Sequence, residues 1–398
     1  MLFADAQRTL QEFLSPLTLD EFLDRTLSGG LQRVAGTGSA ARRALLGPDP
    51  RQLLGAALQL APKLTFHSAN PLGPAPALTG VRDADDFRER IALFHARNYS
   101  VRFPELRPLS PQLDRLARAF EVILLQPVTA SAFWSMGGMR APVHYDDHDL
   151  IVVQLLGAKH WYVANTSELP VPWRGIPPER TELGPHTTFD VSPGDLVYLP
   201  RGTLHSVESA AESLHLSIGF TPLTVREGLI AAVDQLSEVD RALRETIGGR
   251  LAWQLGGAGS ERLAGPVLEG LERLRAACRM PGFLAAALQR RSSRIVATLA
   301  PLPAGTAPVT LDLDCELVQS ETAFCQLTGN SEKIDFSYPG GHIYIHRAAE
   351  PALLFMVNTP RFRPRDVPGE MGDEVRLSLA SRLVEIGFLK LASSTPPG

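Results

Sequence analysis

The sequence predicts an α+β protein in which a barrel or sandwich of short strands is followed by helices. Between about residues 122 and 220, apolar or β-branched runs alternate with Gly and Pro turns at spacings of roughly 8 to 12 residues, as in all-β barrels. Beyond residue 220 the hydrophobic pattern changes to a helical period. With 398 residues, of which 44% are hydrophobic and 21% charged, the chain has room for two or three domains and a large core.

Composition excludes several classes of protein. The chain has 39 Lys+Arg against 43 Asp+Glu, so it has no basic excess with which to neutralise nucleic-acid phosphates. Its cysteines, Cys278, Cys315 and Cys325, lack CxxC spacing, which argues for a reducing compartment and against a cysteine-built zinc site. Asp5 and Arg8 interrupt the segment where a signal core would lie, and no run approaches the roughly 20 apolar residues of a membrane span. We therefore expect a cytoplasmic protein without a membrane segment or direct nucleic-acid contacts.

The first hundred residues mix helical patches with turns and contain no motif of their own. Strands are predicted over residues 151–156 and 196–199, inside the barrel region. A capping box at residues 224–227 predicts the start of a helix that extends to Gly248. The apolar residues that would share one face of this helix are Leu229, Val233, Leu236, Leu243 and Ile247.

Two more helical patterns follow, one through Val267, Leu271, Leu274 and Cys278 and one from Phe283. Residues 223–300 carry more leucine than an isolated pair of helices can bury, which predicts a homodimer. A linker at 301–308, a strand at 343–345 and a helix from about residue 373, stopped by Gly387, complete the chain.

Polar residues are densest at positions 144–149, directly before the apolar run 150–156. On a strand, alternate residues share a face, so His144 and Asp146 could bind one metal ion. His205, which follows a Pro-Gly-Asp turn and a short strand, is the candidate third ligand. Two imidazoles and one carboxylate form a facial triad that suits Fe(II) and leaves positions open for a bidentate cosubstrate and dioxygen.

A histidine beside an aspartate is more often a hydrogen-bonded pair than a metal site, and only the two segments together favour the metal. His148 shares the face of residues 144 and 146, so spacing alone does not exclude it as a ligand. We expect it either to support the ligands from behind or to take no part in the site. Asp147 and Asp149 would point away on a regular strand.

Four segments carry a resemblance to a known family: residues 144–147, 154–161, 193–205 and 213–220. Together they resemble the JmjC-type ribosomal oxygenases, which belong to the cupin superfamily. The resemblance is strong over about residues 120–222 and fainter beyond, where residues 362–369 are similar to the C-terminal segment of the family. It implies a hydroxylase that depends on Fe(II), 2-oxoglutarate and O2 and modifies an arginine or histidine of a ribosomal protein.

The same resemblance implies a double-stranded β-helix (JmjC/cupin barrel) with N-terminal helices. Residues 1–222 would form the catalytic domain with its helical extension, 223–300 a helical dimerisation region, and 301–398 a winged-helix-like domain. Residues 310–398 hold eight Lys+Arg and twelve Asp+Glu, a balance of -4 that favours protein contacts over DNA.

The resemblance to this family implies that His144, Asp146 and His205 hold the iron in this protein. The basic residue thirteen positions past the aspartate, Lys159, would bind the far carboxylate of 2-oxoglutarate, and Ser135 would lie beside that carboxylate. The chemistry of 2-oxoglutarate also calls for a cation beside its far carboxylate, because removing an unpaired carboxylate from water into a pocket costs free energy. From the residues alone, Lys159 could instead be a solvent-exposed lysine in a hairpin after Gly157.

His215 is either a wall of the cavity or a hydrogen-bonded barrel residue, and Trp161 and Tyr198 are expected to fill the core. Two other functions stay open. One is a peptide-tailoring hydroxylase of a biosynthetic pathway, because the first hundred residues resemble the ribosomal enzymes only loosely. The other is a cupin-like metal-binding module without turnover, which the intact triad and Lys159 weigh against.

Overall fold

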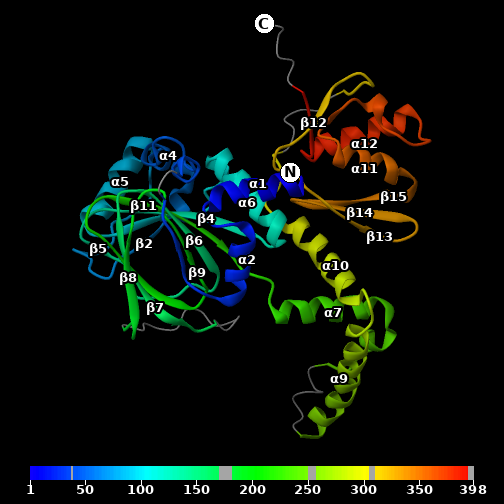
Figure 1. The fold of residues 1–398 in the computed structure, drawn as a ribbon, viewed down its shortest axis with the longest axis horizontal. Helices are drawn as coiled ribbons and strands as arrows, with labels where there is room; N and C mark the ends of the chain where they lie inside the picture. The colour runs from blue at the N-terminus through cyan, green and yellow to red at the C-terminus, as the bar shows by residue number, and fades with distance from the viewer. Residues whose placement is uncertain (37–38, 170–181, 250–256, 304–309, 393–398) are drawn as a thin grey trace. The chain divides into compact units, whose positions relative to one another are not determined.

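The computed structural model describes residues 1–398 except 37–38, 170–181, 250–256, 304–309 and 393–398 (Figure 1). Contacts between residues divide it into two compact units, Met1–Pro222 and Leu223–Gly398. Both units contain helices and antiparallel sheets, which confirms the predicted α+β class. None of the described helices is both long and apolar enough to cross a membrane. The division into three domains stays a prediction.

The first unit begins with helices, and most of its strands follow. Its helical segments are α1 (Phe3–Leu14), α2 (Leu19–Ser28), α3 (Ala40–Arg43), α4 (Pro50–Gly55), η1 (Leu58–Lys63), α5 (Ala84–Ala96), η2 (Arg107–Leu109) and α6 (Pro111–Leu124). Its strands are β1 (Gln32–Val34), β2 (Thr65–His67), β3 (Ser100–Phe103), β4 (Val128–Ser135), β5 (Met139–Arg140), β6 (Asp149–Leu156), β7 (Lys159–Ser167), β8 (His186–Val191), β9 (Leu196–Leu199), β10 (Thr203–Ser209) and β11 (Ser213–Phe220).

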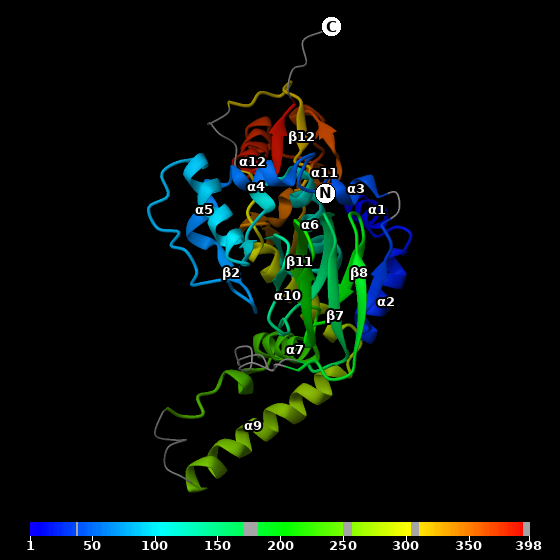
Figure 2. The same ribbon diagram turned by 90° about the vertical axis from the view of Figure 1, so that its left-hand side faces the viewer.

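These strands form two antiparallel sheets that make the predicted barrel. The larger sheet has the order β1-β9-β6-β11-β4-β3-β2, and the smaller has the order β5-β10-β7-β8. Figure 2 shows β7 and β8 of the smaller sheet as neighbouring strands. The predicted strands at 151–156 and 196–199 are confirmed as parts of β6 and β9.

The two faces of the larger sheet differ in polarity. In β4 and β11 the paired residues Phe133 and His215, like the paired serines around them, face the smaller sheet, where His215 lies against Trp161. The intervening residues Ala132 and Leu216 face the helical side and are fully buried. Polar groups therefore line one part of the barrel interior, which suits a polar ligand. An apolar cluster that includes Val152, Trp161 and Val207 fills another part.

Helix α6 packs against α1 and β4 on the outside of the larger sheet. The residues at its first turn explain why the helix begins at Pro111. The Ser110 hydroxyl accepts a hydrogen bond from the Leu113 N–H, and Pro111 occupies a position where no N–H is needed. Rings from helices and strands meet on this outer face: Phe13, Phe22, Phe120, Tyr198 and Phe220. The predicted core role of Tyr198 is confirmed.

The turn between β6 and β7 requires glycine at position 157. Gly157 has φ +62°, and a Cβ there would lie 2.0 Å from the Glu212 carbonyl oxygen. Only glycine combines this left-handed conformation with such a close approach. The tight turn sets Lys159 as the first residue of β7.

The second unit starts with helices and continues into two small sheets. Its elements are α7 (Val225–Val239), η3 (Arg241–Arg244), α9 (Gly257–Cys278), α10 (Phe283–Thr298), β12 (Leu317–Gln319), β13 (Gln326–Gly329), β14 (Lys333–Tyr338), β15 (Gly341–His346), η4 (Arg347–Ala349), α11 (Glu350–Asn358), β16 (Arg361–Phe362), η5 (Pro364–Asp366), α12 (Asp373–Glu385) and β17 (Leu389–Leu391). The sheets have the orders β16-β12-β17 and β13-β14-β15.

The capping box before α7 is confirmed, since Thr224 and Glu227 bond each other's backbone N–H groups. The predicted length of this helix is wrong, because α7 ends at Val239 instead of reaching Gly248. Asp240 adopts an extended conformation, and its carboxylate caps the following η3 segment through the Ala242 N–H. A local cap therefore interrupts an apolar pattern that would otherwise continue the helix.

The remaining elements of the second unit agree with the sequence. The predicted strand at 343–345 lies inside β15, and α12 begins at Asp373, with Gly387 at φ +75° after its end. A core cluster that includes Leu317, Phe336 and Leu353 joins these elements. The winged-helix-like assignment stays a prediction.

Candidate functional site

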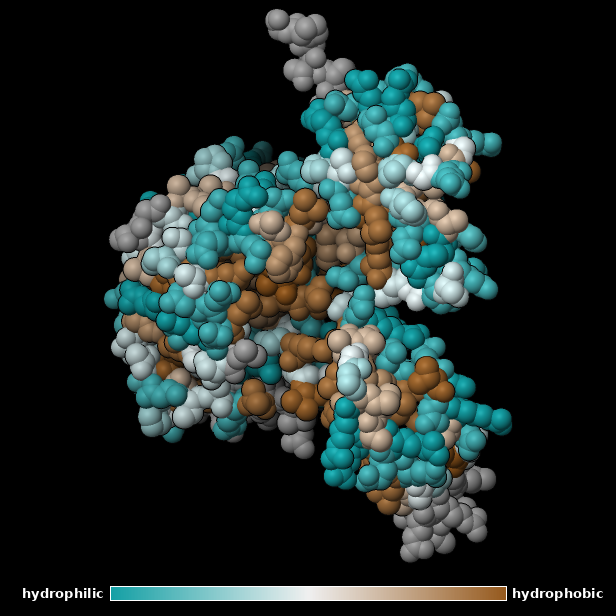
Figure 3. Space-filling model, turned by 45° about the vertical axis from the view of Figure 1, so that its right-hand side comes forward, coloured by the Kyte–Doolittle hydropathy of each residue, from teal (hydrophilic) through white to brown (hydrophobic). Residues whose placement is uncertain are grey.

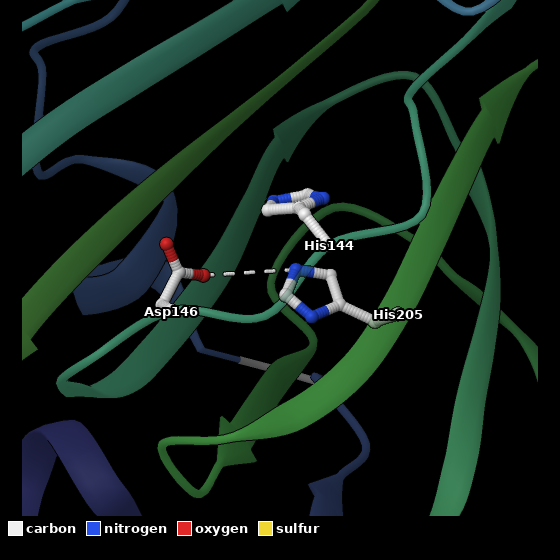
Figure 4. A group of neighbouring side chains, drawn as sticks. All are labelled: His144, Asp146 and His205. Carbon is white, nitrogen blue, oxygen red and sulfur yellow. Dashed lines mark ion pairs between the residues drawn. The ribbon is translucent and has the colours of Figure 1, made fainter. Parts of the chain in front are cut away.

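His144, Asp146 and His205 lie together at the barrel, as Figure 4 shows. One donor atom from each lies within 4.8 Å of the others. The His205 Nε2 atom is 3.7 Å from an Asp146 carboxylate oxygen, and the two imidazole centroids are 4.3 Å apart. The structure thus brings together two segments separated by about sixty residues, as the sequence predicted.

The local backbone differs from the prediction. His144 and Asp146 do not lie on a regular strand, because β6 begins only at Asp149. Instead, His144 and His205 form an isolated bridge in which each N–H donates to the other's carbonyl, at 3.1 and 2.8 Å. The Gly202 N–H donates to the Asp146 carbonyl at 2.8 Å. These long-range backbone bonds, rather than strand alternation, hold the two side chains on one side.

Backbone carbonyls orient both imidazoles. The Nδ1 atom of His144 lies 2.8 Å from the Pro142 carbonyl oxygen, and that of His205 lies 2.9 Å from the Thr203 carbonyl oxygen. A protonated Nδ1 donating to a carbonyl leaves Nε2 as the free electron-pair donor. Both rings therefore have the arrangement of metal-ligating histidines.

Burial keeps His205 neutral. The residue is 3% exposed and its ring stacks on Trp161, with centroids 5.7 Å apart. Burial, helped by the nearby His144, lowers the pKa of His205 to about 4. An imidazole must be unprotonated to bind a metal, so this environment favours ligation. Trp161 is buried as predicted, and it also forms one wall of the site.

Lys159 points into the barrel and not into solvent. It is 2% exposed, and its ammonium group donates to the Ser135 hydroxyl at 3.0 Å. The Ser135 hydroxyl also lies 2.8 Å from that of Ser100. Across the described part of the chain, no carboxylate comes within ion-pair distance of Lys159. Burial lowers its pKa from 10.5 to about 7, which marks a cation without a counter-charge.

His215 lies on the inner face of β11, against Phe133 and Trp161. It is 6% exposed, stacks on Phe133 with centroids 4.9 Å apart, and has no hydrogen-bond partner at Nδ1. Burial, followed by the charges of Lys159 and His205, lowers its pKa well below the ordinary value. A buried imidazole nitrogen without a partner indicates a wall that awaits a polar ligand.

The neighbouring polar residues lie apart from the triad's donor atoms. His148 is bonded to the exposed carboxylate of Asp147 at 2.8 Å. Asp149 is buried and accepts hydrogen bonds from the Tyr198 hydroxyl and the Arg201 N–H. Arg201 thus helps to fix the turn before β10, and Asp149 points toward the helical side.

A divalent metal and a small dicarboxylate fit the residues present. The donor set of two imidazole nitrogens and one carboxylate suits Fe(II). The unpaired ammonium group of Lys159 and the free nitrogen of His215 suit an anion with oxygen acceptors.

Sequence reasoning missed two polar residues at the edge of the larger sheet, Arg102 and His67. Arg102 on β3 and His67 on β2 lie on strands of three or four residues that show no recognisable pattern. Only the addition of these strands to the edge of the larger sheet, through β4, brings them to the site.

Comparison with known proteins agrees with this geometry. The sequence pattern of the JmjC domain family matches residues 107–227. Ribosomal oxygenase 2 of Mus musculus is 29% identical over 130 residues, which cover 31% of this chain and 28% of that protein. The bifunctional lysine-specific demethylase and histidyl-hydroxylase NO66 of Drosophila persimilis is 42% identical over 79 residues, or 19% of this chain and 11% of that protein. The matches thus span less than a third of the length of these relatives.

Two solved structures of the Escherichia coli ribosomal oxygenase YcfD share the fold. One has a TM-score of 0.55 at 16% identity and covers 95% of this chain and 99% of that chain. The other, in complex with cobalt and 2-oxoglutarate, has a TM-score of 0.54 at 15% identity, with the same coverage. The predicted JmjC/cupin barrel is therefore confirmed as the fold.

Proposed function

We propose that the protein is an Fe(II)- and 2-oxoglutarate-dependent hydroxylase of a protein side chain and a member of the ribosomal oxygenases, because residues 107–227 match the JmjC domain family and part of the chain is similar to those enzymes. The observation that carries the proposal is that the barrel holds both a His-Asp-His cluster and a buried ammonium group, that of Lys159. A metal-binding module that catalyses no reaction would not require the buried ammonium group of Lys159.

We assign a role to each residue of the cavity. His144, Asp146 and His205 would hold the iron, and Lys159 would bind the far carboxylate of 2-oxoglutarate. When bound, iron, 2-oxoglutarate and O2 supply the oxidant that adds one oxygen atom to a carbon of the substrate. The chain itself needs no acid or base for this step.

The protein's contribution is positioning. The Pro142 and Thr203 carbonyls fix the rings of His144 and His205, so their Nε2 atoms keep a defined direction. Ser135 holds the Lys159 ammonium group while Ser100 holds Ser135, which prepares the cavity before the cosubstrate enters. Because these side chains are already held in place, the binding of 2-oxoglutarate has a lower entropic cost.

A ribosomal protein is the substrate that the relatives' names favour. The modified residue would be the arginine or histidine that the resemblance to the family implies. To test this, the protein would be incubated with Fe(II), 2-oxoglutarate and ribosomal proteins in air, followed by intact mass spectrometry. We expect one ribosomal protein to gain the mass of one oxygen atom, and only when 2-oxoglutarate is present. A protein that binds the metal but never decarboxylates 2-oxoglutarate would be a binding module instead.

We also propose that the helices of the second unit mediate a homodimer. Exposed apolar residues recur at helical spacing on α7 and α9, as brown patches on the helices at the lower right of Figure 3 illustrate. They include Val225, Leu229 and Val233 on α7 and Val267, Leu268 and Leu271 on α9. Clusters of exposed apolar side chains of this kind are typical of protein–protein interfaces.

Sedimentation velocity tests the dimer. Leu271→Glu is expected to convert a dimer to monomer, because it places a charge among apolar side chains at the interface. Leu93→Glu, on α5 of the first unit, is the matched control, since Leu93 is 53% exposed and Leu271 54%. A wild-type protein that stays monomeric at every concentration would contradict the proposal.

The predicted cytoplasmic location remains part of the proposal. All three cysteines, Cys278, Cys315 and Cys325, are free, which fits a reducing compartment.

A further inference from the structure

Asp149 is a buried carboxylate three residues past Asp146 in the chain. Its side chain is 3% exposed, and it accepts hydrogen bonds from the Tyr198 hydroxyl at 2.5 Å and from the Arg201 N–H at 3.2 Å. The Arg201 guanidinium group reaches the same carboxylate at 3.4 Å. An apolar side chain of similar size often stabilises a buried position as well or better, because a carboxylate loses its hydration. The residue at 149 therefore suits a specific set of hydrogen bonds more than it suits packing.

The turn before β10 binds the segment that carries Asp146 at two points. Two consecutive N–H groups of this turn, those of Arg201 and Gly202, donate to the Asp149 carboxylate and to the Asp146 carbonyl, at 3.2 and 2.8 Å. Gly202 has φ +77°, the left-handed conformation that glycine adopts without strain. Because the two donors are adjacent in one turn, the backbone of residues 146–149 is fixed relative to that turn at both ends.

The same turn reaches the third member of the triad. The Thr203 carbonyl oxygen lies 2.9 Å from Nδ1 of His205 and orients its ring. The His205 N–H in turn donates to the His144 carbonyl at 2.8 Å. Both segments that carry the triad therefore contact one turn, and the carboxylate of Asp149 binds that turn to the start of β6.

Tyr198 connects Asp149 to the hydrophobic core. Its side chain is fully buried in β9, and its ring packs edge-on against Phe22 with centroids 5.7 Å apart. Burial, followed by the charge of Asp149, raises the pKa of Tyr198, so the hydroxyl keeps the proton that it donates. The Asp149 carboxylate is thus held from the core on one side and holds the turn on the other.

We propose that Asp149 is a positioning residue of the metal centre, which fixes the separation of Asp146 and His205 through the turn at residues 200–203. The inference rests on the proposed function, because that function assigns the metal to the triad. Asp149 does not bind the ion itself, since its oxygens are engaged by Tyr198 and Arg201 on the helical side of the sheet. Without it, the two ligand segments would lose their defined spacing before the metal arrives.

Calorimetric titration of the full chain with Mn(II) tests this role. Asp149→Ala is expected to weaken Mn(II) binding by about 10- to 100-fold, the usual effect of losing a residue that orients metal ligands. Asp149→Asn removes the same charge but keeps an oxygen for the Arg201 N–H, and should recover most of the lost affinity. Equal losses in both variants would overturn the inference, because the effect would then follow the charge and not the hydrogen bond.

Asp86→Ala is the matched control for Asp149→Ala. Asp86 on α5 is also buried, at 9% exposure, and accepts hydrogen bonds from the Arg82 N–H and the Arg90 guanidinium group, both at 3.0 Å. Both alanine variants should unfold at a lower temperature than the wild type, since both leave buried donors without an acceptor. Only Asp149→Ala should lose Mn(II) affinity. An equal loss in Asp86→Ala would overturn the inference, because general loosening of the unit would then explain it.

The wild type separates failure of the inference from failure of the proposed function. If the wild type binds no Mn(II), the proposed function fails and the inference falls with it. If it binds Mn(II) and Asp149→Ala binds equally well, the inference alone is overturned. Should Asp149→Ala not fold, Tyr198→Phe takes its place. It removes one hydrogen bond to the carboxylate and should weaken Mn(II) binding by about threefold to tenfold, whereas wild-type affinity would overturn the inference.

Discussion

Replacing Asp146 with alanine is expected to abolish hydroxylation and to weaken metal binding by at least about 100-fold. Asp146 supplies the only carboxylate of the cluster, and its oxygen lies 3.7 Å from His205 Nε2. Two imidazoles alone would leave a divalent ion without its charged ligand. Calorimetric titration with Mn(II), together with 2-oxoglutarate turnover in the presence of Fe(II), measures both effects.

Asp147→Ala is the matched control for Asp146→Ala. The Asp147 side chain is 80% exposed and bonds only His148 in the described structure. Both variants remove one negative charge within the same loop, so a general electrostatic effect would appear in both. Equal losses of metal affinity in the two variants would contradict the assignment of Asp146 as a ligand.

Replacing Lys159 with methionine is expected to weaken 2-oxoglutarate binding by more than about 100-fold, because breaking a buried ion pair costs roughly 3 to 5 kcal/mol. Metal affinity in the absence of 2-oxoglutarate should not change, since Lys159 touches Ser135 and none of the triad. Methionine has a similar shape and no charge to desolvate. At pH 6 the variant should therefore be at least as stable as the wild type in thermal unfolding.

The lowered pKa of Lys159 also predicts how the wild type responds to pH. The folded protein releases this proton above pH 7, whereas the unfolded chain keeps it until about pH 10.5, so the free energy of unfolding should rise with pH across this interval. Binding of a dicarboxylate requires the ammonium form, so 2-oxoglutarate affinity should fall above pH 7, by up to about tenfold per pH unit. Calorimetry with Mn(II) between pH 6.5 and 8.5 measures this slope. A flat affinity, or a Lys159→Met variant that binds 2-oxoglutarate normally, would contradict the role of Lys159.

Strand patterns predicted a barrel or sandwich, and the resemblance to a family narrowed this to the JmjC/cupin barrel. The convergence of His144, Asp146 and His205 was expected as well, but not the reason for it. Spacing of His144 and Asp146 indicated a shared face on a strand, whereas the structure holds them through a backbone bridge to His205. Such a bridge joins residues far apart in the chain, so no local pattern reveals it. The three side chains lie together in the structure, and their role as metal ligands stays a prediction.

Other features depend on tertiary contacts that a single sequence does not encode locally. Side chains alternate between the two faces of the sheet along β7, so the sequence leaves two possible directions for Lys159. Only the packing of the two sheets decides that it is buried. The short strands that carry His67 and Arg102 have too few residues for a recognisable period. The end of α7 is set by the Asp240 cap, which competes with an apolar pattern that continues past it.

A crystal structure of the protein with Mn(II) and 2-oxoglutarate would test whether His144, Asp146 and His205 bind the metal and Lys159 the cosubstrate. We expect one anomalous peak about 2.2 Å from His144 Nε2, Asp146 and His205 Nε2, with the far carboxylate of 2-oxoglutarate against Lys159 and Ser135. A metal held elsewhere, or a cosubstrate whose far carboxylate lies away from Lys159, would contradict it.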